Sequence, residues 1–227
     1  MKGQETVSYA RSFLIGMILG DSYVRRRAKQ RSTVEWTVSH SERCGDLVEW
    51  KRDELVRLFK VQKPTIHVSP NGEGLKHVFS FTAGGRIRVV SQWFSKEGRR
   101  RLTPKIRFMD HPVGLAMLLC DDGSVRKRKK FHRDGSLYHL KPSFTIATHS
   151  FSLEEVRRLL DHLSSLFGVE GLVNPERRMR NGERKEYYRC HFNVESSRKL
   201  WALVEPYIPQ VPSMRTKFAY AYECFGH

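Results

Sequence analysis

Two aspartates stand at matching places in the two halves of this 227-residue chain. Asp21 follows the apolar run 13–20, and Asp122 follows the run 113–120 after one intervening residue, so the two lie 122 − 21 = 101 positions apart. Two carboxylates held close together repel unless a divalent cation lies between them, and Mg²⁺ prefers oxygen ligands. Such a pair could support phosphodiester hydrolysis, in which a metal polarises the phosphate and activates a water.

Small residues indicate how the two apolar runs could meet as helices. Gly16 and Gly20 are four positions apart and share one helix face, where a second backbone can approach closely. Ala116 and Cys120 give the second run a similar spacing. We therefore expect two packed helices whose carboxyl ends bring the two acids side by side. Capping alone explains the acids less well, because a carboxylate is unfavourable at a helix C-terminus.

The segments that follow each run also repeat, which predicts one plan used twice. Alternating strands are expected at 33–40 and 143–147, and amphipathic helices at 46–59 and 152–167. Second strand pairs (65–68 with 76–82, 172–180 with 185–193) and closing helices (85–94, 197–207) complete each unit. The predicted fold class is α+β, with two pseudo-symmetric αββαββα units. The predicted boundaries are an N-terminal subdomain 1–98, a linker 99–111 and a C-terminal subdomain 112–227.

The charge of the chain points to a polyanionic partner. Lys and Arg number 41 and Asp and Glu 24, which gives a net charge of +17 and a pI near 10.0. Phosphate neutralisation and counterion release favour basic residues in nucleic-acid binding. The basic residues occur in every region, so they belong to a folded surface, and nucleic acid is a better candidate than a membrane.

Several other classes of protein are disfavoured. The four cysteines are far apart, without a C-x-x-C pair, which fits neither a structural zinc site nor a disulfide framework. The longest apolar run, 13–19, is too short to span a bilayer, and no small-residue cleavage site follows it. We expect a reducing compartment, the cytoplasm or nucleoid of a prokaryote or an organelle, and no secretion.

Two nine-residue windows, Leu14–Ser22 (LIGMILGDS) and Leu115–Gly123 (LAMLLCDDG), resemble the motifs of the LAGLIDADG homing endonucleases. The resemblance is to the single-chain, two-motif type encoded by group I introns, and it covers nearly the whole chain. Ser22 replaces the final glycine of the first motif, and Met117 occupies the early glycine position of the second. The resemblance implies a DNA-binding β-saddle with the motif helices packed at its centre.

The resemblance also implies a function. It is a site-specific double-stranded DNA endonuclease that cleaves a long, nearly asymmetric target by Mg²⁺-dependent hydrolysis. Mn²⁺ is expected to substitute for Mg²⁺, and Ca²⁺ to support binding without cleavage. The implied partner is the duplex target, with intron RNA as a further one to consider, and the protein is expected to be a monomer that does not bind membranes.

The family pattern assigns roles to particular residues. Asp21 and Asp122 are the expected catalytic acids and metal ligands, with Gly20 and Asp121 beside them at the metal. The family places one such aspartate at each of two centres, one for each DNA strand, and keeps a basic residue near each centre. Arg101, in the segment Arg101–Pro104, matches the first place, and Lys217 matches the second, with Arg215 close behind it. An arginine there would act mainly as an electrophile, because it does not readily lose a proton.

Basic residues on the strands after each motif are the expected DNA contacts. Arginine suits bidentate contact with guanine in the major groove, and neighbouring cations would serve phosphates. A single charge run is usually just solvated surface, but here basic strands recur at matched places in both halves. The expected contacts are Tyr23, Arg25, Arg27, Lys29, Thr37, Ser39, Lys76, Arg126, Arg128, Lys130, Thr145, Arg178, Arg180, Lys185 and Arg189.

One alternative remains open, and a second is disfavoured. The open alternative is a non-catalytic protein on the same fold, either a maturase that helps an intron RNA to fold or a DNA- or RNA-binding regulator. A pure binder has no need of both acids, and both are present. The disfavoured class is an intein, because Met1 is not a Cys or Ser nucleophile and no Asn ends the sequence.

Overall fold

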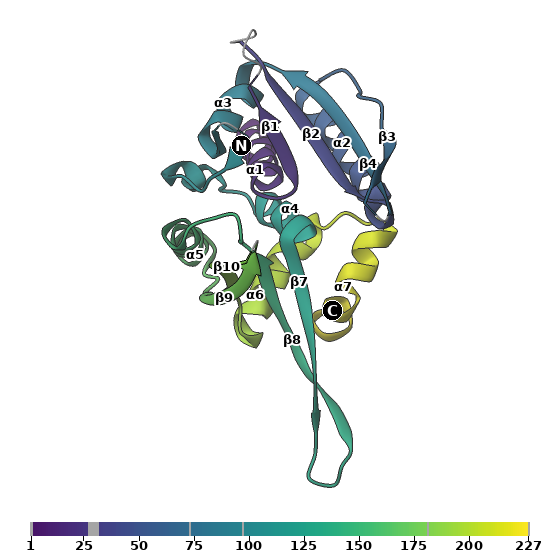
Figure 1. The fold of residues 1–227 in the computed structure, drawn as a ribbon, viewed down its shortest axis with the longest axis vertical. Helices are drawn as coiled ribbons and strands as arrows, with labels where there is room; N and C mark the ends of the chain where they lie inside the picture. Colours follow the sequence, from purple (N-terminus) through teal and green to yellow (C-terminus); the bar gives the residue numbers. More distant parts are fainter. Residues whose placement is uncertain (1, 27–31, 73, 97, 181, 227) are drawn as a thin grey trace.

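The computed structural model describes residues 2–26, 32–72, 74–96, 98–180 and 182–226. The N-terminal half contains α1 (Lys2–Leu19), β1 (Ser22–Arg25), β2 (Val34–Ser41), α2 (Gly45–Phe59), β3 (His67–Asn71), β4 (Gly74–Ala83) and α3 (Gly85–Phe94). The C-terminal half contains α4 (Pro112–Asp122), β7 (Gly123–Phe131), β8 (Leu137–Ala147), α5 (Leu153–Phe167), β9 (Leu172–Arg180), β10 (Glu183–His191), α6 (Val194–Val204) and α7 (Pro212–Phe225). Figure 1 shows these elements in space.

Each half builds one antiparallel four-stranded sheet, and the two sheets have corresponding strand orders. The first has the order β1-β2-β4-β3 and the second β7-β8-β10-β9. Helices α2 in the first half and α5 and α6 in the second pack against the strands of their own sheet. The α+β fold with two pseudo-symmetric αββαββα units is therefore confirmed, with α7 added after the second unit.

Alternation along the strands explains why one face of the first sheet is buried. Val34, Trp36 and Val38 of β2 are buried, whereas Glu35 and Thr37 between them are partly exposed, as is Ser39 after them. In the second half, a capping box starts α5: Ser152 accepts from the Glu155 amide, and the Glu155 carboxylate accepts from the Ser152 amide. The helix predicted at 152–167 therefore begins at the residue after its expected cap.

The segment between the two halves contains more structure than a plain linker. A short hairpin, β5 (Ser95–Lys96) with β6 (Arg99–Arg100), is followed by the 3₁₀ turn η2 (Pro104–Phe108). Leu102, Ile106 and Met109 are buried in the common core. The domain boundaries remain a prediction, but this segment packs as part of the molecule.

The β7–β8 hairpin extends beyond the second sheet. The pairing between β10 and β8 involves only residues 145–147, whereas β7 pairs with β8 from Gly123 to Phe131. Residues 126–143, called the arm below, therefore project as a two-stranded ribbon (Figure 1). The register shifts opposite Pro142, which cannot donate a ladder hydrogen bond. The turn of this hairpin lies at residues 132–136.

Helix α7 braces the base of the arm. The Tyr220 hydroxyl donates to the Leu140 carbonyl at 2.6 Å, and Lys127 Nζ lies 4.5 Å from the centre of the Tyr220 ring. At the other end of α7, the Ser213 amide donates to the Asp46 carboxylate of α2 at 2.8 Å. This helix therefore connects the arm to the N-terminal half. Across the described residues, we find no helix whose length and apolar character would let it cross a bilayer.

Candidate active site and nucleic-acid interface

Helices α1 and α4 touch backbone to backbone at the centre of the molecule. A Cβ atom at Gly16 would lie 2.2 Å from the Gly114 carbonyl oxygen, and one at Gly114 would lie 2.6 Å from the Ser12 oxygen. The expected approach at Gly16 is confirmed, and the atoms nearest to Gly16 and Gly20 belong to Gly114 and Asp121, where small residues were expected at Ala116 and Cys120. Gly114 and Asp121 are seven residues apart, which is two helical turns, and they form the contacting face of α4.

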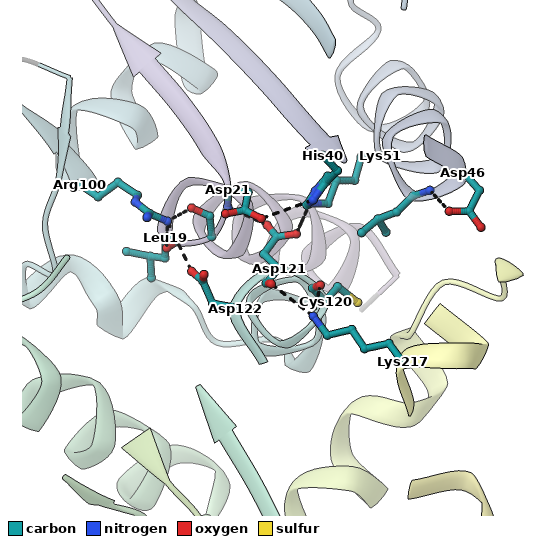
Figure 2. Close-up of polar contacts among 12 residues, drawn as sticks. Leu19, Asp21, His40, Asp46, Lys51, Arg100, Cys120, Asp121, Asp122 and Lys217 are labelled. Carbon is teal, nitrogen blue, oxygen red and sulfur yellow. Dashed lines mark hydrogen bonds and ion pairs between the residues drawn. The ribbon is translucent and has the colours of Figure 1, made fainter. Parts of the chain in front are cut away.

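The close packing brings the two predicted catalytic acids to neighbouring helix ends (Figure 2). Asp21 is exposed, with 39% of its side chain accessible, and Asp122 is largely covered, with 18% accessible. Burial, and after it the negative charge of Asp21, raises the pKa of Asp122 to about 7. Two carboxylates that resist ionising together provide oxygen donors suited to a divalent cation. The pair therefore fits the metal that the sequence predicts.

A basic side chain contacts the carboxyl end of each central helix at equivalent carbonyl groups. Arg100 donates to the Leu19 carbonyl at 2.8 Å and also to the Gly20 carbonyl. Lys217 donates to the carbonyls of Cys120 and Asp121, at 2.6 and 3.3 Å. The contacted carbonyls are 101 positions apart, the same offset as the two acids. Cations at helix C-termini are favourable, because the last carbonyls lack helical partners.

The basic residue at the carboxyl end of α1 is Arg100, one position before the predicted Arg101. Arg100 Nη1 also lies 3.5 Å from the Asp122 carboxylate. The Arg101 side chain is exposed and faces a separate pocket shared with Tyr23 and Arg25. Strand alternation explains the difference, since adjacent residues leaving β6 point to opposite sides. Lys217 lies where it was predicted, and Arg215 is exposed on another side of α7.

A buried cluster that the sequence did not predict adjoins Asp21. Lys51 of α2 contacts the Asp121 carboxylate, and its Nζ lies 2.9 Å from His40 Nε2. Burial alone would raise the pKa of Asp121, but Lys51 and His40 hold the pKa of this carboxyl well below its usual range. One signal was available: Lys51 lies four residues from both Leu47 and Leu55, on the buried side of its helix.

The other two predicted metal ligands are already engaged. Asp121 is paired with Lys51, and the carbonyl of Gly20 accepts from Arg100. Asp21, His40 and Asp121 do bring one potential ligand atom each within 4.8 Å of one another. The Lys51 ammonium group already supplies a positive charge there, which disfavours a further cation at this cluster.

The predicted DNA contacts lie on the faces of the two sheets opposite their helices. Strand register places Tyr23, Arg25, Thr37, Ser39 and Lys76 on one face of the first sheet, and Arg126, Arg128, Lys130, Arg178, Arg180, Lys185 and Arg189 on one face of the second. For Arg128 and Arg180 only the backbone is described. Arg27 and Lys29 lie outside the described residues. Thr145 is a correction: its side chain is buried, and its hydroxyl lies 2.7 Å from that of Ser124.

Acidic residues on the same faces hold several of these cations. Arg25 pairs with Glu35 at 2.8 Å, and Lys185 pairs with Glu183 at 3.2 Å. Glu176 accepts from Arg178 at 2.8 Å and from Arg189 Nη2 at 3.4 Å, and it also lies 3.1 Å from His149. These contacts orient the guanidinium groups on the open face. Pairs this exposed contribute little stability, so they can be exchanged for phosphate.

Comparison with known proteins identifies a family whose sequence profile this chain matches. A sequence profile described as the LAGLIDADG DNA endonuclease family matches residues 11–200. A protein named RecA from Mycolicibacterium chitae is 23% identical over 208 residues, and an uncharacterized protein of Methanocaldococcus jannaschii is 23% identical over 211. These matches cover 90% and 91% of this chain but only 45% and 72% of the two relatives, so the chain spans about half of the first.

The fold is similar to solved structures of homing endonucleases. The homing endonuclease I-WcaI, bound to its DNA recognition sequence, aligns with a TM-score of 0.64 at 20% identity, over 92% of this chain and 85% of its own. A variant of I-DmoI bound to target DNA with Mg²⁺ aligns with a TM-score of 0.55 at 13% identity, over 88% and 98%. Other I-DmoI complexes with DNA contain Mn²⁺ or Ca²⁺.

Proposed function

Because the chain belongs to the LAGLIDADG DNA endonuclease family, we propose that it cleaves both strands of a long, asymmetric duplex site in a reaction that requires Mg²⁺. One observation carries this proposal. Two acids, Asp21 and Asp122, end the two central helices between two sheets whose open faces carry the basic residues. Charge attracts the duplex, and the paired carboxylates supply a site for the metal that hydrolysis requires.

The residues around the acids divide the chemistry between them. Asp21 and Asp122 would hold Mg²⁺, which would supply a Lewis acid and lower the pKa of a bound water. Arg100 and Lys217 bring one positive charge to each helix end, where they can stabilise the charge that develops on the phosphate in the transition state. Covering of Asp122 by protein strengthens these interactions, because water screens them less.

The sheets would position the duplex over the acids. Arg25 and Tyr23 on β1, and Arg126 and Lys130 on β7, project from strands that begin within two residues of a catalytic acid. Side chains on such strands can read base edges in the major groove while their neighbours contact phosphate. The proposed substrate is cellular DNA in a prokaryote or an organelle, bound by a single copy of the chain.

Binding and cleavage need to be measured on the same DNA. The probe is a plasmid that carries the target, selected from a randomised duplex library by binding in Ca²⁺. We expect a gel shift in Ca²⁺, and linear product in Mg²⁺ or Mn²⁺ that EDTA prevents. A gel shift with no cleavage in either ion would instead support the regulator on the same fold. Preferential binding of a folded intron RNA would support the maturase.

A further inference from the structure

Lys51 is an unusual residue because it is a fully buried lysine. Its side chain is 0% exposed, and no other lysine among the described residues is buried. Burying an ammonium group costs free energy unless a partner compensates for it. The partners here are Asp121, which is also 0% exposed, and His40, which is 8% exposed. A buried ion pair is weak evidence for stability, so a role in the site is the better explanation.

The cluster holds Asp21 in two ways. The Asp121 carboxylate accepts a hydrogen bond from the backbone amide of Asp21 at 3.0 Å. His40 Nδ1 lies 3.4 Å from the Asp21 carboxylate, while its Nε2 lies 3.3 Å from that of Asp121. Lys51 contacts both Asp121 and His40, so its charge fixes the two groups that set the position of Asp21 (Figure 2).

Gly20 makes room for this arrangement. A Cβ atom at Gly20 would lie 2.2 Å from the Asp121 carboxylate oxygen and 2.8 Å from its Cβ. The Asp121 side chain therefore crosses the helix contact and enters the N-terminal half. Gly20 is the pseudo-symmetric equivalent of Asp121 and has no side chain that could enter the C-terminal half. Asp21 is therefore contacted by a side chain from the other half, and Asp122 has no equivalent contact from Gly20.

The second half lacks the equivalent cluster. Strand register pairs Ser22 with Val38 and Gly123 with Ile146, which makes Thr148 the equivalent of His40. Thr148 is buried and donates to the Tyr188 carbonyl at 2.7 Å. Because α2 and α5 end at Phe59 and Phe167, 108 positions apart, Leu159 is the equivalent of Lys51. Asp122 has Arg100 beside it instead.

We propose that Lys51 is a positioning residue for the centre that contains Asp21 and not for the centre that contains Asp122. It acts through Asp121 and His40, so the two DNA strands are cut by centres that are held in place differently. This inference rests on the proposed nuclease function. It predicts that loss of the Lys51 charge slows cleavage of only one DNA strand. Because the target is asymmetric and binds in one orientation, the slowly cut strand is the same in every complex.

The variant must keep the fold while it removes the charge. Lys51→Met alone would leave a buried carboxylate without its partner and destabilise the protein. The double variant Lys51→Met/Asp121→Asn replaces both charged side chains with uncharged ones of nearly the same shape. The asparagine retains an oxygen that can accept from the Asp21 amide. The matched control, Lys199→Met/Asp161→Asn, makes the same two changes on the exposed sides of α6 and α5.

Strand-resolved cleavage of the target plasmid in Mg²⁺ is the main readout. We expect nicked circles to accumulate with the double variant, all nicked on one strand, and cleavage of the other strand to slow by about 10- to 100-fold. The control should give linear product at the wild-type rate. A merely structural role would slow both strands equally. Equal slowing, or no slowing, would overturn the proposal.

Amide hydrogen exchange without DNA or metal provides a second readout. A charged acceptor forms a hydrogen bond roughly twice as strong as a neutral one. We therefore expect the Asp21 amide to exchange faster in the double variant, while the Gly123 amide, which donates to Leu119, keeps its rate. Unchanged exchange at Asp21 would overturn the positioning role. If the wild type cuts no DNA, the nuclease proposal fails, and exchange still tests the positioning.

Discussion

At the scale of single residues, the two acids are in different environments although they occupy equivalent positions. Asp21 is exposed and contacts His40, whereas Asp122 is largely covered, and burial together with the charge of Asp21 raises its pKa to about 7. The metal-free protein therefore carries a proton at this site in mildly acidic solution. Metal binding must displace that proton, so affinity for Mg²⁺ is expected to rise with pH between about 6 and 8.

The raised pKa of Asp122 predicts a pH-dependent gain in stability on substitution. The folded state binds this proton more tightly than the unfolded state, so stability falls as pH rises from the unfolded value towards 7. Asp122→Asn should therefore raise the melting temperature in EDTA at pH 8, and only slightly at pH 5. Thermal unfolding at both pH values, with Asp161→Asn as the exposed control, checks this. An equal change at both pH values would contradict it.

The position of Arg100 predicts that adjacent arginines differ in importance. Arg100 contacts the end of α1 and lies beside Asp122, whereas Arg101 is exposed at another pocket. Arg100→Ala should lower the rate of double-strand cleavage by about 100-fold, the usual effect of removing one group that stabilises transition-state charge. Arg101→Ala is the matched control and should change the rate little. Single-turnover cleavage in Mg²⁺ measures both, and a larger loss for Arg101→Ala would refute the assignment.

At the scale of elements, the contact between α1 and α4 sets the distance between the acids. Gly16→Ala would place a methyl group against the Gly114 carbonyl, so the helices must separate. Such overpacking typically costs about 1–3 kcal/mol. We expect a lower midpoint in urea unfolding and slower cleavage. Gly74→Ala, where a Cβ meets nothing within 4 Å, is the control. A Gly16→Ala protein as stable as the wild type would contradict this packing.

The periodicity of apolar residues predicted most of the helices and strands. The features that it did not predict depend on packing between the two halves. Helix 85–94 and strand 172–180 were predicted with the boundaries that the structure shows. Helix α7 was missed because prolines precede it, although Met214, Phe218, Ala221 and Phe225 are spaced to form its buried side. The roles of Gly114 and Lys51 depend on what the other half places against them. No pattern within one helix contains that information.

At the scale of the whole molecule, the net charge of +17 is distributed for DNA binding. The arm extends this positive charge beyond the second sheet. Arg126 and Lys130 lie on the same face of its strand β7, which begins directly after Asp122. We expect this arm to contact phosphates beyond the cleavage site, on one side only. Affinity should then depend steeply on salt concentration.

Charge removal on the arm tests that expectation. The double variant Arg126→Gln/Lys130→Gln should reduce the slope of log affinity against log salt by about 0.9 for each phosphate that the arm no longer neutralises. The matched control, Arg198→Gln/Lys199→Gln, removes the same two charges from exposed positions on α6, behind the sheet. Fluorescence anisotropy in Ca²⁺ at several salt concentrations gives both slopes. Equal slopes for the two variants would exclude the arm from the interface.

The central claim is that Asp21 and Asp122 form the site that cuts a bound duplex. Cleavage of the target plasmid in Mg²⁺ by Asp21→Asn/Asp122→Asn, with binding measured in parallel, tests it most directly. We expect this variant to retain the duplex in a gel shift as the wild type does and to give no linear and no nicked product. Linear product from the doubly substituted protein, at a rate near that of the wild type, would contradict it.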